Sequence, residues 1–284
     1  MIRGRDNKRK ELISILSKSI PEELLSEIPH RWWYVGDVCI VSIPTSLFEF
    51  KEIVGNAFLL LEHGKARTVL GRIGPTSGII RTPSFEYLAG DKNTETIHKE
   101  LGCYFKIDAA KLTFSPGNHS ERERMMNIAS EGEIIIDMFS CVGNLSLPIA
   151  VYKSPKQLIA AEINPLAFDY LTENIALNKV QNRMKAILGD NRITLRDYYG
   201  IADRVISGFL ESDYKQIQSA IRLCKRGATL HYHEATPISE KDTPINKLMK
   251  IASNENREIE MITKRKVKKY SPSIEHIVID ATIH

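Results

Sequence analysis

Three acidic side chains follow three successive predicted strands, at spacings that suit the recognition of a nucleoside. Asp137 ends the first apolar run, Glu162 ends the second, and Asp190, followed directly by Asn191, ends the third. Because parallel strands present their carboxyl ends at one edge of a sheet, we expect these groups to lie together there. A carboxylate about twenty residues beyond the first loop can accept hydrogen bonds from both ribose hydroxyls. Asp190 and Asn191 are placed to reach the exocyclic amine of adenine. One such acid is as well explained by helix capping, but three in succession favour a ligand.

The loop after the first strand narrows the choice of cofactor. It reads Ser140-Cys141-Val142-Gly143-Asn144 and keeps a single glycine. A dinucleotide-binding loop needs G-x-G-x-x-G, because glycines let the backbone approach the pyrophosphate. S-adenosylmethionine carries no phosphate, so its loop tolerates more side chains. The loop therefore argues against a dinucleotide and is compatible with S-adenosylmethionine, and Cys141 is the loop residue that is hardest to explain.

The elements that would carry these groups alternate between strand and helix after residue 116. This alternation predicts βαβ units and a doubly wound, Rossmann-like α/β domain, with two strands in 257–284 as a terminal antiparallel pair at the sheet edge. Before residue 110 the predicted elements are short and mixed, which indicates a small α+β domain. There we expect single strands over 31–44 and 109–116. We assign residues 1–110 to the small domain and 111–284 to the α/β domain.

Composition limits the classes of protein that need to be considered. The apolar fraction of 43% and charged fraction of 26% are those of an ordinary globular protein. A net charge of +4 is a weak argument for nucleic acid, so the local clustering of charge matters more. No apolar run has the length of a membrane span or the form of a signal peptide, so we expect a soluble, cytoplasmic protein. The cysteines contain no CxxC pair, which disfavours a zinc knuckle or a disulfide framework: Cys39, Cys103, Cys141 and Cys224.

Five segments of the chain, in this order, resemble one archaeal and eukaryotic family. They read FSPGNHSERERM, DMFSCVGNLSLPIA, AAEINPLAFDYLTENIALNKV, GDNR and ATLHYHEATP. The family is that of the tRNA wybutosine-synthesis aminocarboxypropyltransferases, close kin of the tRNA guanine-N1-methyltransferases. The resemblance covers about residues 95 to 284, with a vaguer match before them. It implies a class I S-adenosylmethionine-dependent transferase that acts on 4-demethylwyosine, a tricyclic guanine derivative 3′ of the anticodon in tRNA-Phe. The group moved would be the 3-amino-3-carboxypropyl chain, with methylthioadenosine released. No membrane and no protein partner are implied.

The resemblance also implies which residues contact the cofactor. Asp137 and its loop would lie beside the methionine end, and the direct contacts would be Ser115, Arg122, Glu162, Asp190 and Asn191. A guanidinium pairs bidentately with a carboxylate, so Arg122 is the expected partner of the amino acid end. A helix-surface ion pair with Glu121, Glu123 or a residue one turn away would also account for Arg122, and capping of the following helix would also account for Ser115.

Two departures separate the chain from the methyltransferase branch that it resembles. Gly117-Asn118 stands where the methyltransferases carry Arg-Leu, and no Asn-Pro-Pro-like motif follows the fourth strand. Ser207-Gly208-Phe209 offers an aromatic face and space there instead. Both departures favour aminocarboxypropyl transfer. The first alternative is a tRNA guanine-N1-methyltransferase with the same fold and cofactor. The second is a non-catalytic RNA-binding module, which Cys141 in the cofactor loop would support.

No residue is identified as the general base that would remove the proton of the ring carbon. Asp137, Glu211, Asp213 and water all remain candidates. His231 and His233 alternate onto one face of a strand, but no third ligand has a suitable spacing. We therefore expect a structural pair and no metal.

Basic residues combine with aromatic ones in three places that suit RNA binding. Residues 264–270 read KRKVKKY, residues 31–34 read RWWY, and residues 4–10 read GRDNKRK. Lysine and arginine contact phosphates, while aromatic rings stack on unpaired bases. The first stretch is also explained by an edge strand protected by lysines, and the second by the core of the small domain.

Overall fold

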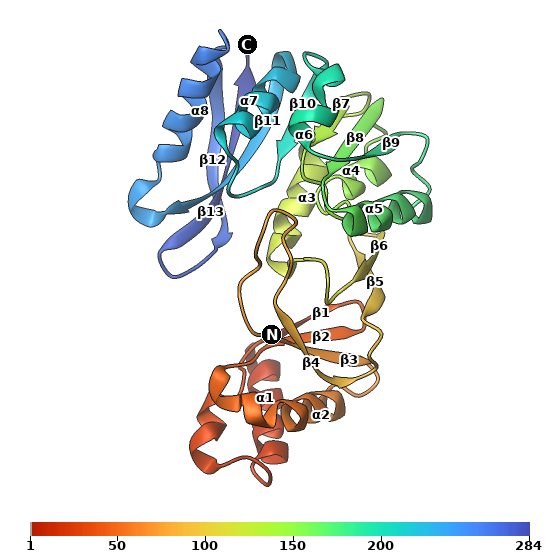
Figure 1. Cartoon of the computed structure of the whole chain (residues 1–284), viewed down its shortest axis with the longest axis vertical. Coiled ribbons are helices and arrows are strands. Elements are labelled where there is room, and N and C mark those ends of the chain that lie inside the picture. The colour runs from red at the N-terminus through yellow and green to blue at the C-terminus, as the bar shows by residue number, and fades with distance from the viewer. Residues whose placement is uncertain (1) are drawn as a thin grey trace. The chain divides into compact units, whose positions relative to one another are not determined.

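The computed structural model describes the backbone of residues 2–284 and the side chains of residues 7–284. The chain divides into two compact units (Figure 1). The first consists of Met1–Lys99 and Lys106–Pro116, and the second of Glu100–Phe105 and Gly117–His284. Among the described residues, no helix is both long enough and apolar enough to span a bilayer.

The first unit is a four-stranded sheet covered by helices. The sheet order is β1-β2-β3-β4, and only the β2–β3 pair is parallel. Helix α2 packs on β3 and β4, and α1 packs on α2 (Figure 1). The strands are β1 (Trp32–Val35), β2 (Val38–Ser42), β3 (Thr68–Arg72) and β4 (Phe85–Gly90). The helices are α1 (Ile2–Leu16), α2 (Lys51–Leu61) and two 3-10 helices, η1 (Glu22–Glu27) and η2 (Thr45–Phe50).

Two strand predictions for this region are wrong in detail. Residues 31–44 form the hairpin β1–β2 rather than one strand, because Gly36 adopts a positive φ of 56° in the turn. A Cβ on Gly36 would lie 2.0 Å from the Thr96 hydroxyl oxygen, so the turn also needs glycine for space. Residues 109–116 form no strand. The Asp108 carboxylate accepts the backbone N–H of Ala110 at 3.1 Å, which bends the chain away from an extended path.

The second unit is built on a seven-stranded sheet. Its order is β12-β13-β11-β10-β7-β8-β9. The strands are β7 (Ile134–Asp137), β8 (Gln157–Glu162), β9 (Met184–Leu188), β10 (Ala202–Ser207), β11 (Cys224–Pro237), β12 (Ile259–Lys269) and β13 (Ile274–Ile283). The helices are α3 (His119–Ile128), α4 (Leu147–Tyr152), α5 (Pro165–Leu177), α6 (Asn191–Thr194), α7 (Tyr214–Leu223) and α8 (Thr243–Asn254). Short 3-10 turns are η3 (Pro116–Asn118), η4 (Arg196–Tyr198) and η5 (Ile238–Glu240). Strands β5 (Glu95–Glu100) and β6 (Cys103–Asp108) form a separate two-stranded sheet, and the division between the two units falls within both strands.

The strand order confirms the predicted doubly wound sheet. Strands β7 to β11 are parallel, and the order runs outward from β7 in one direction through β8 and in the other through β10. The crevice for a ligand therefore lies where β7 and β10 end. The last two strands pair antiparallel as predicted, but β13 lies between β11 and β12. Nearly all of β13 is buried, whereas β12 is mostly exposed, so the apolar strand is inside and the basic strand is at the edge.

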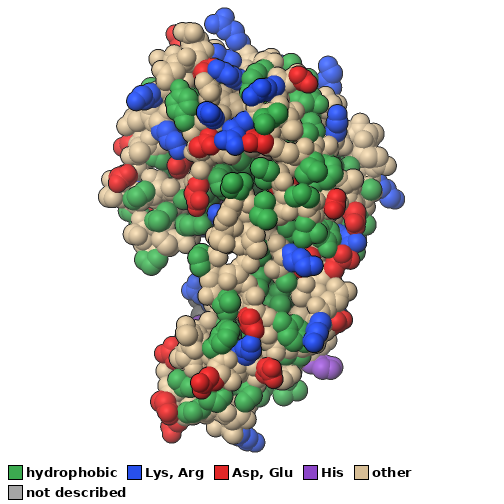
Figure 2. Space-filling view, viewed as in Figure 1, with side chains coloured by type: hydrophobic (Ala, Val, Ile, Leu, Met, Phe, Trp, Pro, Cys, Tyr) green, Lys and Arg blue, Asp and Glu red, His purple; other side chains and the backbone are tan. Residues whose placement is uncertain are grey.

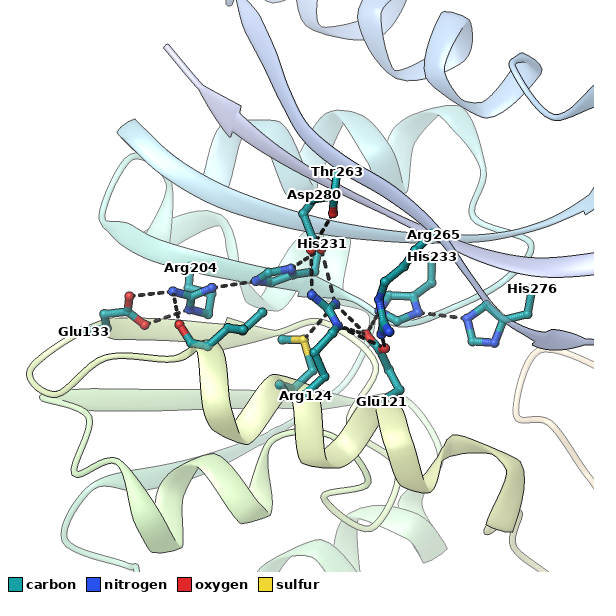
Figure 3. A network of polar contacts seen from close by, with 12 residues as sticks. Glu121, Arg124, Glu133, Arg204, His231, His233, Thr263, Arg265, His276 and Asp280 are labelled. Carbon is teal, nitrogen blue, oxygen red and sulfur yellow. Dashed lines mark hydrogen bonds and ion pairs between the residues drawn. The ribbon is translucent and has the colours of Figure 1, made fainter.

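The two faces of this sheet are covered differently. Leu230 and Tyr232 of β11 belong to the apolar core with α7 and α8. Because side chains alternate along a strand, His231 and His233 point to the opposite face, where α3 lies (Figure 3). Helix α8, between β11 and β12, was not predicted from the sequence.

Candidate active site

The loop after β7 turns tightly through two residues with positive φ. Cys141 has φ of 50° and Gly143 has φ of 94°. The loop is closed by the Gly143 N–H, which donates to the Ser140 carbonyl at 2.8 Å. A Cβ on Gly143 would lie 3.0 Å from the Leu147 Cβ, so this position needs glycine for both backbone and space. Cys141 therefore occupies a conformation that glycine favours, although it carries a side chain.

We expect the Cys141→Gly variant to bind S-adenosylmethionine as tightly as the wild type, or more tightly. Removing the side chain relieves a left-handed backbone cost of about 1–2 kcal/mol. The greater freedom of glycine in the unfolded chain offsets about 0.5–1 kcal/mol of this gain. Calorimetric titration and thermal unfolding measure the two effects. Cys141→Ala is the matched control, because it removes the thiol and keeps the backbone cost. A large loss of turnover in both variants, with unchanged affinity, would assign the thiol a chemical role and contradict this account.

Glu162 joins the end of β8 to this loop. One carboxylate oxygen accepts the Cys141 N–H at 2.6 Å, and the other accepts the Asn164 N–H at 2.8 Å. Burial raises the pKa of Glu162, while these two backbone donors lower it. Each oxygen still has a lone pair for a further donor. The predicted ribose contact is therefore compatible with the geometry of Glu162.

Asp190 and Asn191 differ in how far the protein already engages them. The Asp190 carboxylate caps α6 through the Arg192 N–H at 2.9 Å and binds the Arg192 guanidinium at 2.6 Å. That pairing holds the pKa of Asp190 below its usual value. The Asn191 amide donates to the Met138 carbonyl at 2.8 Å. Its Oδ1 atom is buried and has no hydrogen-bond partner in the described part of the chain. The Oδ1 atom of Asn191 is thus the acceptor that is left for the exocyclic amine of a base.

Asp137 ends β7 beneath the loop and is 1% exposed. One of its oxygens accepts the Phe139 N–H at 3.2 Å. Burial raises the pKa of Asp137 to about 6, and the hydroxyls of Ser146 and Ser140 moderate the shift. Asp137 therefore exchanges a proton closer to neutral pH than an ordinary aspartate does.

Two phenylalanines form a stacked pair at the point where the strand order reverses. Phe139 follows β7 and Phe209 follows β10, with ring centroids 5.3 Å apart and planes inclined by 30°. Gly208 lies in the chain between the end of β10 and Phe209. It has little room for a side chain, since a Cβ there would lie 3.2 Å from a methyl group of Leu145. The predicted aromatic face at 207–209 is present, and Phe139 extends it. The sequence reasoning missed Phe139, although its place two residues after the strand-end acid was a usable signal.

Arg122 is completely buried on α3 and forms an ion pair with Glu100. Its Nη2 lies 3.2 Å from one Glu100 oxygen, and its Nε contacts the other. His119 Nδ1 lies 3.1 Å from the same carboxylate. Arg122 is therefore not the surface ion pair considered above, because Glu121 is the partner of Arg124.

The structure brings five of the six predicted site residues into one unit. Four of them, Asp137, Glu162, Asp190 and Asn191, lie at the carboxyl ends of β7, β8 and β9, and Arg122 lies on α3. Ser115 belongs to the first unit, one residue before η3.

His231 lies in a chain of polar contacts under α3 rather than in the site (Figure 3). Its Nε2 accepts from Arg204 at 2.7 Å, so its Nδ1 carries the proton and donates to Asp280 at 2.6 Å. Arg204 also binds Glu133 at 2.7 Å. Arg124 of α3 binds the same Asp280 at 2.6 Å.

The chain continues from Glu121 toward the edge of the sheet (Figure 3). The Glu121 carboxylate binds Arg124 at 2.6 Å and also contacts Arg265 of β12. His233 and His276 hydrogen-bond to each other at 2.9 Å, and burial lowers the pKa of both to about 3. These histidines therefore join α3 and the neighbouring strands as structural groups. Within the described residues, no group of three His, Cys, Asp or Glu side chains is arranged to hold a metal ion.

A doubly wound sheet with carboxylate and amide side chains at its strand ends, and a loop without the pyrophosphate glycines, is the arrangement of a class I S-adenosylmethionine-dependent transferase. The buried acceptor of Asn191 and the carboxylate of Glu162 fit that cofactor. The chain belongs to the TRM5/TYW2 family. The family model described as the TRM5/TYW2 methyltransferase domain matches residues 96–262, and the one described as the TYW2 N-terminal domain matches residues 12–94.

The relatives of the chain come from two branches of this family. It is 39% identical over 95% of both chains to the tRNA(Phe) (4-demethylwyosine(37)-C(7)) aminocarboxypropyltransferase of Pyrococcus horikoshii. It is 32% identical to the tRNA (guanine(37)-N(1))-methyltransferase Trm5b of Pyrococcus abyssi, over 97% of this chain and 80% of that one. The crystal structure of P. horikoshii TYW2 in complex with MeSAdo superposes with a TM-score of 0.85 at 35% identity, over 97% of this chain and 98% of that one.

Proposed function

We propose that the chain transfers the 3-amino-3-carboxypropyl group of S-adenosylmethionine to 4-demethylwyosine at position 37 of tRNA-Phe. The observation that carries this proposal is the greater identity to the aminocarboxypropyltransferase, 39% against 32% for the methyltransferase, at near-complete coverage of this chain. The surface after β10 supports it, since Ser207-Gly208-Phe209 replaces the polar motif expected of a methyltransferase.

The strand-end groups would hold the cofactor by its nucleoside. Glu162 would accept the ribose hydroxyls, and Asn191 would accept the exocyclic amine of adenine. When bound, S-adenosylmethionine supplies a sulfonium whose three attached carbons are all electrophilic. The protein therefore selects the group transferred by which carbon it points at the target base. Arg122 would bind the amino acid carboxylate, sharing its guanidinium with Glu100.

The target base would stack on the phenylalanine pair, because a flat tricyclic base matches an aromatic face. A ring carbon of the base attacks the carbon of the aminocarboxypropyl chain next to sulfur. The carbon–sulfur bond breaks with its electron pair on sulfur, and the ring carbon then loses its proton. Asp137 is one candidate for the base, and burial raises its pKa to about 6. Asp213 is less suited, because it caps α7 and binds Arg192.

Strand β12 would contribute phosphate contacts at the edge of the second unit. It carries Lys264, Arg265, Lys266, Lys268 and Lys269, and Tyr270 follows it. Lys264, Arg265 and Lys266 already form ion pairs with Asp242, Glu121 and Glu275. The other two basic–aromatic stretches are also engaged, within the first unit. Trp32 packs edge-on against Phe58 in the core and donates to Glu62 at 3.0 Å. Lys8 binds Glu62 at 2.8 Å, while the side chains of residues 4–6 lie outside the described residues.

Product analysis tests the proposal. Purified protein is incubated with S-adenosylmethionine and tRNA-Phe that carries 4-demethylwyosine, and the nucleosides are analysed by mass spectrometry. We expect a 3-amino-3-carboxypropyl adduct together with methylthioadenosine. A methyl adduct with S-adenosylhomocysteine would instead identify a methyltransferase. Tight tRNA binding with no calorimetric binding of S-adenosylmethionine would identify a non-catalytic RNA-binding module.

A further inference from the structure

A cavity in the α/β unit lies between η4 and α7, on residues that the proposed reaction does not use. Its volume is about 340 Å³. It is lined by Arg192, Arg196, Tyr199, Lys215, Gln218, Ser219 and Arg222. Every one of these side chains can donate a hydrogen bond, four of them are cationic and none is a carboxylate. A cavity rich in donors and positive charge suits an anionic ligand.

Carboxylates outside the lining fix two of the four cations. Arg192 binds Asp190 at 2.6 Å and Asp213 at 2.9 Å. Arg222 binds Glu255 at 2.6 Å. These contacts raise the pKa of both guanidinium groups, so both remain charged. They also hold the planar groups in one orientation before a ligand arrives, which lowers the entropy cost of binding.

The other two cations keep their charge available. Arg196 donates through Nε to the Arg192 carbonyl at 3.0 Å, which leaves both terminal nitrogens of its guanidinium for a ligand. Neither Arg196 nor Lys215 has a carboxylate partner within the described part of the chain. Both are exposed. The Tyr199 and Ser219 hydroxyls, 3.3 Å apart, add neutral donors to the same wall.

From these contacts we propose that the cavity binds a phosphate group, and that in the substrate complex this is a backbone phosphate of the tRNA. Several converging N–H donors with a guanidinium fork are the arrangement that proteins use for phosphate oxygens. Blue Lys and Arg side chains gather in the upper part of Figure 2, where Figure 1 labels α6 and α7. A cavity of this size admits a sugar–phosphate unit rather than a phosphate alone.

The position of the cavity in the chain favours RNA over a free anion. Arg192 directly follows Asn191 at the end of β9, and α7 begins at Tyr214, five residues after Phe209 at the end of β10. The helices that line the cavity thus start from the same strand ends as the proposed nucleoside and base contacts. A nucleotide near the modified one would supply the phosphate. This assignment of the source rests on the proposed function.

Neutralising the two available cations tests the proposal. We expect the double variant Arg196→Gln/Lys215→Gln to bind tRNA-Phe at least 10-fold more weakly at moderate salt. The slope of log affinity against log salt should fall by about 1, the value for one lost phosphate contact. The affinity for S-adenosylmethionine, measured by calorimetry, should stay within twofold. The double variant Lys185→Gln/Lys250→Gln is the matched control, because it removes the same charge from exposed positions outside the cavity.

The possible outcomes separate the sources of the phosphate and separate this proposal from the proposed function. Equal tRNA affinity and salt slope in the two double variants would overturn the cavity as a phosphate site for RNA. Inorganic phosphate that binds the wild type in the low millimolar range, but not the cavity variant, with tRNA affinity unaffected, would assign the site to a free anion and overturn the RNA source. Recovery of tRNA affinity by Arg196→Lys in place of Arg196→Gln would support a charge contact. Wild-type protein that binds no tRNA would instead refute the proposed function.

Discussion

Replacing Glu162 by alanine should weaken S-adenosylmethionine binding by about 100-fold or more. The side chain accepts backbone N–H groups from Cys141 and Asn164 and, in the proposed complex, the two ribose hydroxyls. Hydrogen bonds to a charged group contribute about 1.5–3 kcal/mol each, and about 1.4 kcal/mol corresponds to a tenfold change in affinity. The loop would also lose the contact that fixes Cys141. Isothermal titration calorimetry measures the affinity directly.

Glu162→Gln is the control for this prediction. Glutamine keeps one acceptor oxygen and the shape of glutamate but loses the charge and one acceptor position. We expect it to fall between the wild type and Glu162→Ala. The far-UV spectrum and unfolding temperature of each variant separate loss of binding from loss of fold. An alanine variant that is folded and binds within threefold of the wild type would remove Glu162 from the cofactor site.

Mild acid should destabilise the protein because buried histidines resist protonation in the folded state. The pKa of His233 and His276 lies at about 3 in the folded protein, and burial lowers that of His231 as well. Unfolded histidines have a pKa near 6.5, so between pH 6.5 and 3 the unfolded chain binds more protons at His233 and His276. The free energy of unfolding therefore falls as the pH falls through this window. At pH 5 His233 and His276 each contribute about 2 kcal/mol to this loss.

Buried carboxyl groups with a raised pKa oppose this loss, because they stabilise the folded protein as the pH falls. Asp137 has a pKa of about 6 when folded, so below pH 6 the folded protein takes up a proton that the unfolded chain does not. It returns about 1.4 kcal/mol by pH 5. The raised pKa values of Glu162 and Glu234 act in the same direction. For His233, His276 and Asp137 together, we expect a net loss of about 2–3 kcal/mol between pH 7.5 and 5.

Urea unfolding at several pH values measures this loss. His276→Gln should make it smaller by about one histidine's share, 2 kcal/mol, because one proton-binding group is gone from the unfolded chain. Asp137→Asn should make it larger, because the opposing proton uptake is removed. A free energy of unfolding that is the same at pH 7.5 and 5 in all three proteins would show that the histidines titrate normally in the folded state.

The parts of the site that follow from sequence are those fixed by strand geometry. Asp137, Glu162 and Asn191 were predictable because each follows a predicted strand, and parallel strands end at one edge of the sheet. The doubly wound sheet was predictable for the same reason, since alternating strands and helices allow few other arrangements. The position of β13 inside the sheet was not predictable, because its buried residues include Glu275, His276 and Asp280 beside the apolar ones.

The parts that did not follow from sequence are contacts between distant residues. The partner of Arg122 is Glu100, which lies 22 residues away on β5, so no helical spacing could point to it. The stacking of Phe139 on Phe209 joins two strands that are not consecutive in the chain. The irregular path of 109–116 arises from a local carboxylate–backbone contact that competes with strand formation.

The placement of β13 makes the basic edge of the sheet depend on a single pairing. Strand β12 pairs with β13 and with no other described strand, and β13 pairs with β11. Strands β12 and β13 form a local hairpin, whereas pairing of β11 with β13 closes a longer loop that contains α8 and β12. A change that weakens the β11–β13 pairing would therefore detach the basic strand β12 from the sheet together with β13.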